Sequence, residues 1–140
     1  MLDLSAAFDA TDRSILLARL RTLFGIKDMA LKWFHSYLED RIQCVVAGGI
    51  RSNPRKVLYG IPQGSVLGPV LFSMFMRPLA DIIQHHRLQY HLYADDSQIY
   101  VSCVPSKLEE SVHHVQTCIQ DVGAWMQENL LQLNNDKTEI

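Results

Sequence analysis

Two adjacent aspartates, Asp95 and Asp96, are the residues of this chain best suited to carry chemistry. They lie within the segment His91–Tyr100, in which apolar and aromatic residues come before them and β-forming residues resume directly after them. This pattern predicts a β-hairpin with both carboxylates at its turn. Neighbouring carboxylates repel each other, so a function that keeps both ionised requires a cation. Asp-Asp is also ordinary turn chemistry, and on its own the pair would favour that structural interpretation.

Composition limits the classes of protein to which the chain can belong. With 140 residues and 48% apolar content, it is long enough for one globular domain with a core. The net charge of −2 is unevenly distributed: residues 1–77 carry ten Lys/Arg and six Asp/Glu, and residues 78–140 carry three and nine. A self-sufficient nucleic-acid binder is usually more basic. Any phosphate-binding surface must therefore be local, or lie outside this chain.

Two further residue types bear on metal sites and on the cellular compartment. The three cysteines, Cys44, Cys103 and Cys118, are widely spaced among apolar residues, which predicts buried free thiols in a reducing compartment, the nucleus or the cytoplasm. The histidines, among them His85-His86 and His113-His114, lack acid or thiol partners at ligand spacing and are interpreted as solvated surface residues. No apolar run approaches the length of a membrane-spanning helix, so no membrane partner is expected.

The elements that must position the aspartates follow from periodicity and turn residues. Helices are predicted over 13–24, from 28 to about 38, over 66–84 and from 106 to about 126; strands or hairpins are predicted over 1–4, 41–59, 91–100 and near 131–140. Asp28 and Ser106 are the predicted N-caps of the second and last helices. This alternation predicts an α+β fold, with helices packed on one face of a sheet.

Two helices carry specific expectations about which side chains are buried. In the helix over 13–24, leucines at helical spacing predict the buried face and leave Arg13 and Arg19 outside it. In the last helix, the apolar positions from Leu108 to Met126 form one continuous stripe. Both helices are predicted to contribute to the core.

Further motifs accompany the aspartate pair, and together they identify a family. They are Leu2–Asp9, Gly60–Phe72, Tyr93–Asp96 and the segment from Trp125 to Glu139. In this order they resemble reverse transcriptases, most closely those of non-LTR (LINE-type) retrotransposons. The Gly60–Phe72 block is the most specific of the motifs, and the resemblance covers nearly the whole chain.

The resemblance implies a polymerase palm, an antiparallel sheet with helices on one face, in which Asp3 on one strand meets Asp95 and Asp96. It implies RNA-directed DNA synthesis: nucleotidyl transfer from a dNTP to the 3′-hydroxyl of a DNA primer on an RNA template. The three aspartates would bind two Mg²⁺ ions, with Mn²⁺ as an alternative, and Asp96 would contribute least. Lys137 matches a lysine near the nucleotide phosphates that would protonate the leaving pyrophosphate; a surface lysine in a turn is the competing interpretation.

The resemblance also assigns nucleotide- and template-binding residues. Phe8, next to Ala7, matches the aromatic residue that excludes a ribose 2′-hydroxyl; alternatively it is an aromatic core residue. Gln63 and Gly64 match a loop beside the template base and incoming nucleotide; alternatively they form an ordinary turn before a helix. Asp9 and Ser65 are expected to be structural, through hydrogen bonds to nearby backbone. The cations Arg51, Arg55 and Lys56 either contact template or primer phosphates or form a charged edge hairpin.

Some features depart from the family pattern. Ala6 stands where lysine is frequent, and Ala10–Arg13 differs from the usual Thr-Val-Asp-His. The family's fingers precede Asp3 and its thumb follows the last motif, so residues 1–140 are expected to be a partial reverse transcriptase domain, the palm without fingers or thumb. The alternative is a truncated, catalytically inactive remnant with at most weak nucleic-acid binding.

Overall fold

The computed structural model describes residues 2, 4, 5 and 7–134. The helices are α1 (Ala7–Ala10), α2 (Arg13–Thr22), α3 (Asp28–Leu38), α4 (Gly68–His85) and α5 (Leu108–Glu128), with the short 3₁₀ helix η1 (Pro105–Lys107) before α5. The strands are β1 (Leu4–Ser5), β2 (Ile42–Gln43), β3 (Val46–Ala47), β4 (Ile50–Arg51), β5 (Arg55–Lys56), β6 (Gln89–Tyr93), β7 (Asp96–Tyr100) and β8 (Gln132–Leu133). The predicted order of helices and hairpins is confirmed over these residues.

The strands near the aspartate pair form two separate antiparallel two-stranded sheets. β6 pairs with β7, and β1 pairs with β8. Leu2 joins the two pairs, because its N–H donates to the Ser97 carbonyl at 2.8 Å and its carbonyl accepts from the Ser97 N–H at 3.3 Å. The N-terminal segment thus links the aspartate hairpin to the C-terminal strand.

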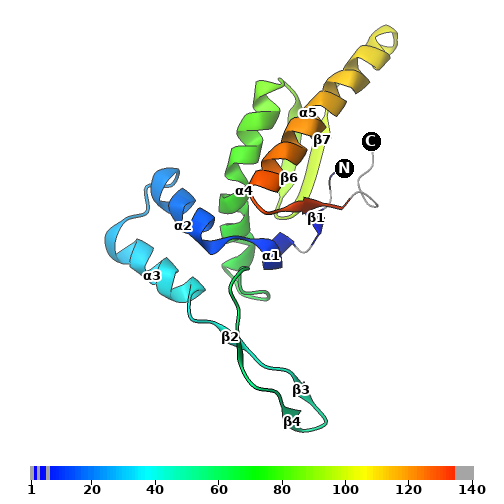
Figure 1. The fold of residues 1–140 in the computed structure, drawn as a ribbon. Coiled ribbons are helices and arrows are strands. Elements are labelled where there is room, and N and C mark those ends of the chain that lie inside the picture. The colour runs from blue at the N-terminus through cyan, green and yellow to red at the C-terminus, as the bar shows by residue number, and fades with distance from the viewer. Residues whose placement is uncertain (1, 3, 6, 135–140) are drawn as a thin grey trace.

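Helix α4 is the centre of the packing (Figure 1). It contacts α2 on one side and α5 and β6 on the other, and α5 also contacts β8. Eight of its residues are buried, including Phe72 and Phe75, which are fully buried. Pro69 lies in its first turn, where the missing N–H costs nothing, and Pro78 lies inside the helix. The apolar face of this helix therefore holds together elements from both ends of the chain.

The β6–β7 hairpin has one covered side and one open side. Leu92 pairs with the buried Ser97, whereas the cross-strand pairs His91–Gln98 and Tyr93–Asp96 are exposed. This alternation is the period of two expected of a half-buried strand. The α+β fold class is confirmed, and the acidic Asp96 side chain belongs to the open side of the hairpin.

Two predicted N-caps are wrong. Lys27 and Lys107, not Asp28 and Ser106, occupy the N-cap positions of α3 and α5, and neither makes a side-chain capping bond. The capping side chain that sequence reasoning missed is Asp12, which accepts hydrogen bonds from the backbone N–H groups of Ser14 and Ile15 at the start of α2. Burial acts to raise the pKa of Asp12, but these bonds and one from the Ser14 hydroxyl outweigh it and lower the pKa below 3.8.

Two arginines predicted to lie outside the core are instead part of it. Arg13 is buried. Arg19 is partly buried, with its guanidinium 4.4 Å from the centre of the Phe75 ring and 5.2 Å from that of Trp125. It also donates to the Phe75 carbonyl and to the Asn129 side chain. Periodicity cannot detect such residues, because the planar guanidinium packs on aromatic rings while its donors reach acceptors on other helices.

Other burial predictions need correction. The stripe on α5 is not continuous core: Val122 and Met126 are buried, but Leu108 is 57% exposed. Of the three free cysteines, only Cys118 is buried. His86 is not simply solvated, since its Nε2 lies 2.7 Å from a carboxylate oxygen of Asp121. Within the described part of the chain, no helix has both the length and the hydropathy needed to cross a membrane.

Candidate functional site

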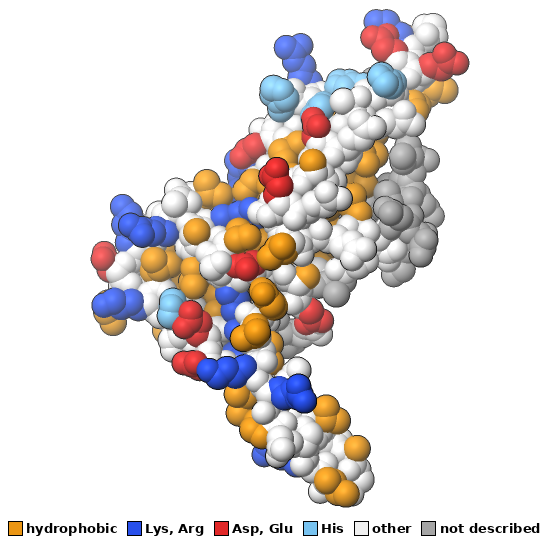
Figure 2. Space-filling view, viewed as in Figure 1, with side chains coloured by type: hydrophobic (Ala, Val, Ile, Leu, Met, Phe, Trp, Pro, Cys, Tyr) orange, Lys and Arg blue, Asp and Glu red, His pale blue; other side chains and the backbone are white. Residues whose placement is uncertain are grey.

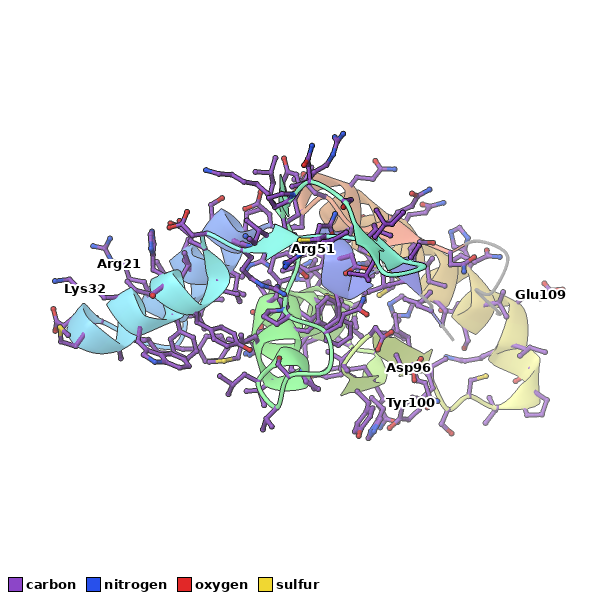
Figure 3. All side chains as sticks on the ribbon, turned by 90° about the horizontal axis from the view of Figure 1, so that it is seen from below. Arg21, Lys32, Arg51, Asp96, Tyr100 and Glu109 are labelled. Atoms are coloured by element: carbon purple, nitrogen blue, oxygen red, sulfur yellow. The ribbon has the colours of Figure 1, made fainter. Side chains whose placement is uncertain are left out.

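Asp95 and Asp96 lie at the tip of the β6–β7 hairpin, as predicted. The Tyr93–Asp96 pair closes a two-residue turn formed by Ala94 and Asp95. Ala94 has φ of 52°, a left-handed conformation that costs a non-glycine residue on the order of 1–3 kcal/mol. Figure 3 shows Asp96 on the hairpin, well away from the α2–α3 side of the molecule where Arg21 and Lys32 lie.

The carboxylate pair has no cationic partner among the residues that the structure describes. None of the ion pairs and side-chain hydrogen bonds there involves Asp95 or Asp96. Two adjacent acids without a counter-charge suit hard divalent cations, which prefer carboxylate oxygens. No group of three or more His, Cys, Asp or Glu side chains comes together in the described ranges. The predicted third ligand, Asp3, and the predicted proton donor, Lys137, lie outside these ranges.

A second feature is an open depression of about 460 Å³ beside α1 and the N-terminus of α4. Its lining residues are Phe8, Pro62, Gln63, Gly64, Ser65, Gly68 and Pro69. The Phe8 ring stacks on Phe72, with centroids 4.9 Å apart and planes 27° from parallel. The structure therefore brings Phe8 together with Gln63 and Gly64, and it holds the Phe8 ring against the core.

Helix α1 and the loop before α4 are tied together through their backbones. The Gly60 N–H donates to the Thr11 carbonyl at 2.8 Å, and the Ile61 N–H donates to the Phe8 carbonyl at 2.9 Å. Arg13 adds side-chain bonds from Nε to the Gly60 carbonyl at 3.1 Å and from Nη2 to the Tyr59 carbonyl at 2.8 Å. Burial, with a smaller contribution from the nearby Arg41 charge, lowers the pKa of Arg13 from its ordinary value. These bonds fix the distance between Phe8 and the Gln63 loop.

Gln63 is oriented by Asp9. Its Nε2 donates to Asp9 Oδ2 at 2.9 Å. Because an ionised carboxylate only accepts hydrogen bonds, the amide nitrogen must be the end that faces Asp9. The amide oxygen of Gln63 is then the end available to accept a bond from a ligand. Asp9 was predicted to form hydrogen bonds with nearby backbone; its partner is instead the Gln63 side chain, so this prediction is wrong.

The remaining predicted residues have clear local roles. Ser65 accepts from the Gly68 N–H at 3.0 Å and donates to the Pro62 carbonyl at 2.7 Å, which confirms a structural role at the start of α4. Gly64 has φ of +71°, and no atom lies within 4 Å of the point that a Cβ would occupy, so its surroundings are open. Ala7 is buried and does not line the depression; its carbonyl accepts from the Thr11 hydroxyl at 3.0 Å.

Sequence reasoning missed the contributions of Asp9, Arg13 and Asp12. An aspartate directly before a helical pattern is a recognisable capping signal, so Asp12 could have been found. The Arg13 and Asp9 contacts join positions 46 to 54 residues apart, and no local pattern indicates them.

Comparisons with known proteins agree with the motifs. The family model described as reverse transcriptase (RNA-dependent DNA polymerase) matches residues 1–140. The chain is similar to a probable RNA-directed DNA polymerase from transposon BS of Drosophila melanogaster, with 31% identity over 98% of this chain and 15% of the relative. It is 33% identical, over 70% of its length and 11% of the relative, to the RNA-directed DNA polymerase from the mobile element jockey of the same species.

A third relative belongs to another retrotransposable element. It is the retrovirus-related Pol polyprotein from the type-1 element R2 of Popillia japonica, with 33% identity over 56% of this chain and 13% of the relative. The chain thus spans 15% or less of the length of these curated relatives.

Proposed function

This chain belongs to the reverse transcriptase family, of the kind found in non-LTR retrotransposons, and we propose that it forms the palm of an RNA-directed DNA polymerase. In this proposal residues 1–140 are a partial reverse transcriptase domain that works with fingers and thumb regions. The reaction is nucleotidyl transfer from a dNTP to the 3′-hydroxyl of a DNA primer paired with an RNA template.

The antiparallel bridge between Leu2 and Ser97 is the observation that carries the proposal. Leu2 directly precedes Asp3 in the chain, and Ser97 directly follows Asp96. Leu2 and Ser97 are both buried, at 2% and 1% exposure, and side chains alternate between the faces of a strand. In the proposal, the Asp3 carboxylate belongs to the same open face as Asp96, and Asp95 contributes from the adjoining turn.

The donor set fits divalent cations. Asp95 and Asp96 carry adjacent negative charges without a protein counter-charge in the described ranges, and in the proposal Asp3 supplies the third carboxylate. When bound, two Mg²⁺ ions, or Mn²⁺, would supply activation of the primer hydroxyl and neutralisation of charge on the leaving pyrophosphate. The role of the protein is to hold three carboxylates ionised and close together, which costs free energy through their mutual repulsion.

The depression beside α1 would receive the sugar and base of the nucleotide. The Phe8 ring, stacked on Phe72, would occupy the space that a ribose 2′-hydroxyl needs, which would favour dNTP by steric exclusion. Gln63 would offer its amide oxygen to a hydroxyl donor, and the open surroundings of Gly64 would admit a base or backbone closely. The buried Ala7 would act indirectly, by packing α1 against the core. Lys137 would protonate the pyrophosphate.

The test is primer extension by the 140-residue chain on an RNA template with dNTPs and Mg²⁺. Asp95→Asn keeps the size of the side chain but removes the charge. We expect it to lower extension at least about a thousandfold, since metal stabilisation of the transition state is worth several kcal/mol and each ~1.4 kcal/mol is tenfold in rate. Asp28→Asn, an identical change at the exposed start of α3, is the matched control and should retain activity.

A second measurement separates metal binding from catalysis. Mn²⁺ should broaden the backbone amide NMR signals of Ala94 and Ser97 in the wild-type chain, and the broadening should disappear in Asp95→Asn. Broadening that persists in this variant, or extension that survives it, would contradict the assignment. A folded wild-type chain that binds Mn²⁺ but does not extend a primer would mean that the metal site alone is insufficient and that these residues need the fingers and thumb regions.

A further inference from the structure

A second charged surface lies on the hairpin formed by residues 41–57, here called the projecting hairpin. It is closed at its base by a bond from the Val57 N–H to the Arg41 carbonyl at 2.9 Å, and its two ladders are β2–β5 and β3–β4. Figure 1 shows it extending away from the body of the molecule. Little of it is buried: Val46 is 67% exposed and Ile50 is 77% exposed.

The charge of this hairpin is all of one sign. It carries Arg41, Arg51, Arg55 and Lys56, and no Asp or Glu occurs between Arg41 and Ala80. The cross-strand partners of these cations do not neutralise them: Lys56 pairs with Ile42, Arg55 with Gln43 and Arg51 with Val46. Figure 2 shows basic and hydrophobic side chains, and no acidic ones, on the visible face of the hairpin beyond its base.

The base and the outer part of the hairpin differ in their surroundings. At the base, Arg41 and Lys56 line the same polar depression as Glu39 and Asp40, so acids lie near them. Arg51 and Arg55 lie farther along the hairpin, and neither takes part in an ion pair with a described residue. Arg51 donates only to the Cys44 sulfur, at 3.2 Å, among the described contacts. These two arginines are therefore the cations free to meet an anionic partner.

We propose that the projecting hairpin binds the sugar–phosphate backbone of a nucleic-acid duplex through Arg51 and Arg55. The proposal rests on the proposed function, because it names the duplex of template and primer as the partner. The segment 41–57 contains no Phe, Tyr or Trp on which unpaired bases could stack. Arginine contacts to phosphates hold a duplex in position without reading its sequence. The exposed side chains of Val46 and Ile50, beside Arg51, would lie against the sugars.

The experiment measures binding of the 140-residue chain to a fluorescent RNA–DNA hybrid by anisotropy, without nucleotide or divalent metal, across a range of NaCl concentrations. Each phosphate contact contributes a slope of about −0.9 to the plot of log affinity against log salt. Arg51→Gln and Arg55→Gln should each reduce the slope by about that amount, which is roughly eightfold weaker binding at 0.1 M salt. The double variant should bind roughly 60-fold more weakly.

Matched controls lie on the other side of the molecule. Arg21 and Lys32 are exposed cations on α2 and α3, remote from the hairpin (Figure 3). Arg21→Gln combined with Lys32→Gln removes the same net charge and should leave the slope unchanged. If it lowers the slope as much as the hairpin pair, binding follows overall charge and the proposal is wrong. Absence of wild-type binding at ~20 mM salt also overturns it.

The exposed aliphatic residues provide the test against a protein partner. If Ile50→Ser abolishes self-association in sedimentation while Arg51→Gln and Arg55→Gln leave duplex affinity intact, the hairpin is a protein interface and the proposal fails. Because the assay contains neither metal nor nucleotide, its result is independent of Asp95. A chain that binds duplex through the hairpin but cannot extend a primer would count against catalysis by these 140 residues alone and would retain this inference.

Discussion

Replacing Gly60 by alanine should destabilise the chain strongly, because Gly60 meets two requirements that only glycine satisfies. Its φ is +86°, and a Cβ there would lie 3.0 Å from Asp9 Cα, from the Asp9 carbonyl oxygen and from the Phe8 carbonyl oxygen. All three are backbone atoms, so no flexible side chain can move to make room. The Gly60 N–H also donates to the Thr11 carbonyl just after α1, next to the bond from the Ile61 N–H to Phe8 in α1.

The magnitude follows from these two terms. A left-handed backbone costs a non-glycine residue of order 1–3 kcal/mol. Forcing an extra atom into a packed site costs typically ~1–3 kcal/mol more. We therefore expect Gly60→Ala to lower the free energy of unfolding by about 2–6 kcal/mol. Relief of the overlap would move the loop away from α1, which separates Gln63 from Phe8.

Gly64→Ala is the matched control, because Gly64 has a similar φ of +71° but no atom within 4 Å of the Cβ position. Only the backbone term applies there, so the loss should be smaller by about 1–3 kcal/mol. Urea unfolding followed by circular dichroism at 25 °C measures both variants. Equal losses, within about 0.5 kcal/mol, would refute the claim that contact with α1 makes glycine necessary at position 60.

Three further predictions concern two buried groups, the Ser97 hydroxyl and the Cys118 thiol. The Ser97 hydroxyl is buried without a hydrogen-bond partner among the described residues, so Ser97→Ala should raise the free energy of unfolding in urea by about 1 kcal/mol. The control Ser73→Ala, at an exposed serine, should change it by less than ~0.5 kcal/mol. A loss of stability in Ser97→Ala would show that the hydroxyl has a partner. Burial, with help from the Asp121 charge, raises the pKa of the Cys118 thiol from 9.0 to about 11. The exposed Cys103 should therefore react with a thiol reagent at pH 8 long before Cys118 does, and equal rates would contradict the burial of Cys118. Because the folded-state pKa is the raised one, this contribution to stability is complete below pH 9 and is lost as the pH rises toward 11, a decline that Cys118→Ala should not show.

Local patterns predicted the helices and hairpins well, but predicted the helix caps and the buried polar side chains poorly. The Asp95-Asp96 hairpin, the loop over 60–65 and the apolar helix after it were all predictable, because turn residues and side-chain periodicity act over a few positions. The caps at Asp28 and Ser106 were wrong, since neighbouring residues compete for the first helical turn and packing decides among them. Arg19 was also misassigned, because an amphipathic side chain can enter a core from a position that looks polar.

The sequence by itself determined the family, the α+β class and the residues that could carry the chemistry. Only the tertiary structure decided which distant residues meet. Examples are the bridge between Leu2 and Ser97, the hydrogen bond from Gln63 to Asp9 across 54 positions, and the hydrogen bond from Arg13 to the Gly60 carbonyl across 47. Periodicity records which face of an element is buried, but not what lies against that face. Contacts between distant segments depend on the combined packing of several elements around α4, and no short stretch of residues encodes them.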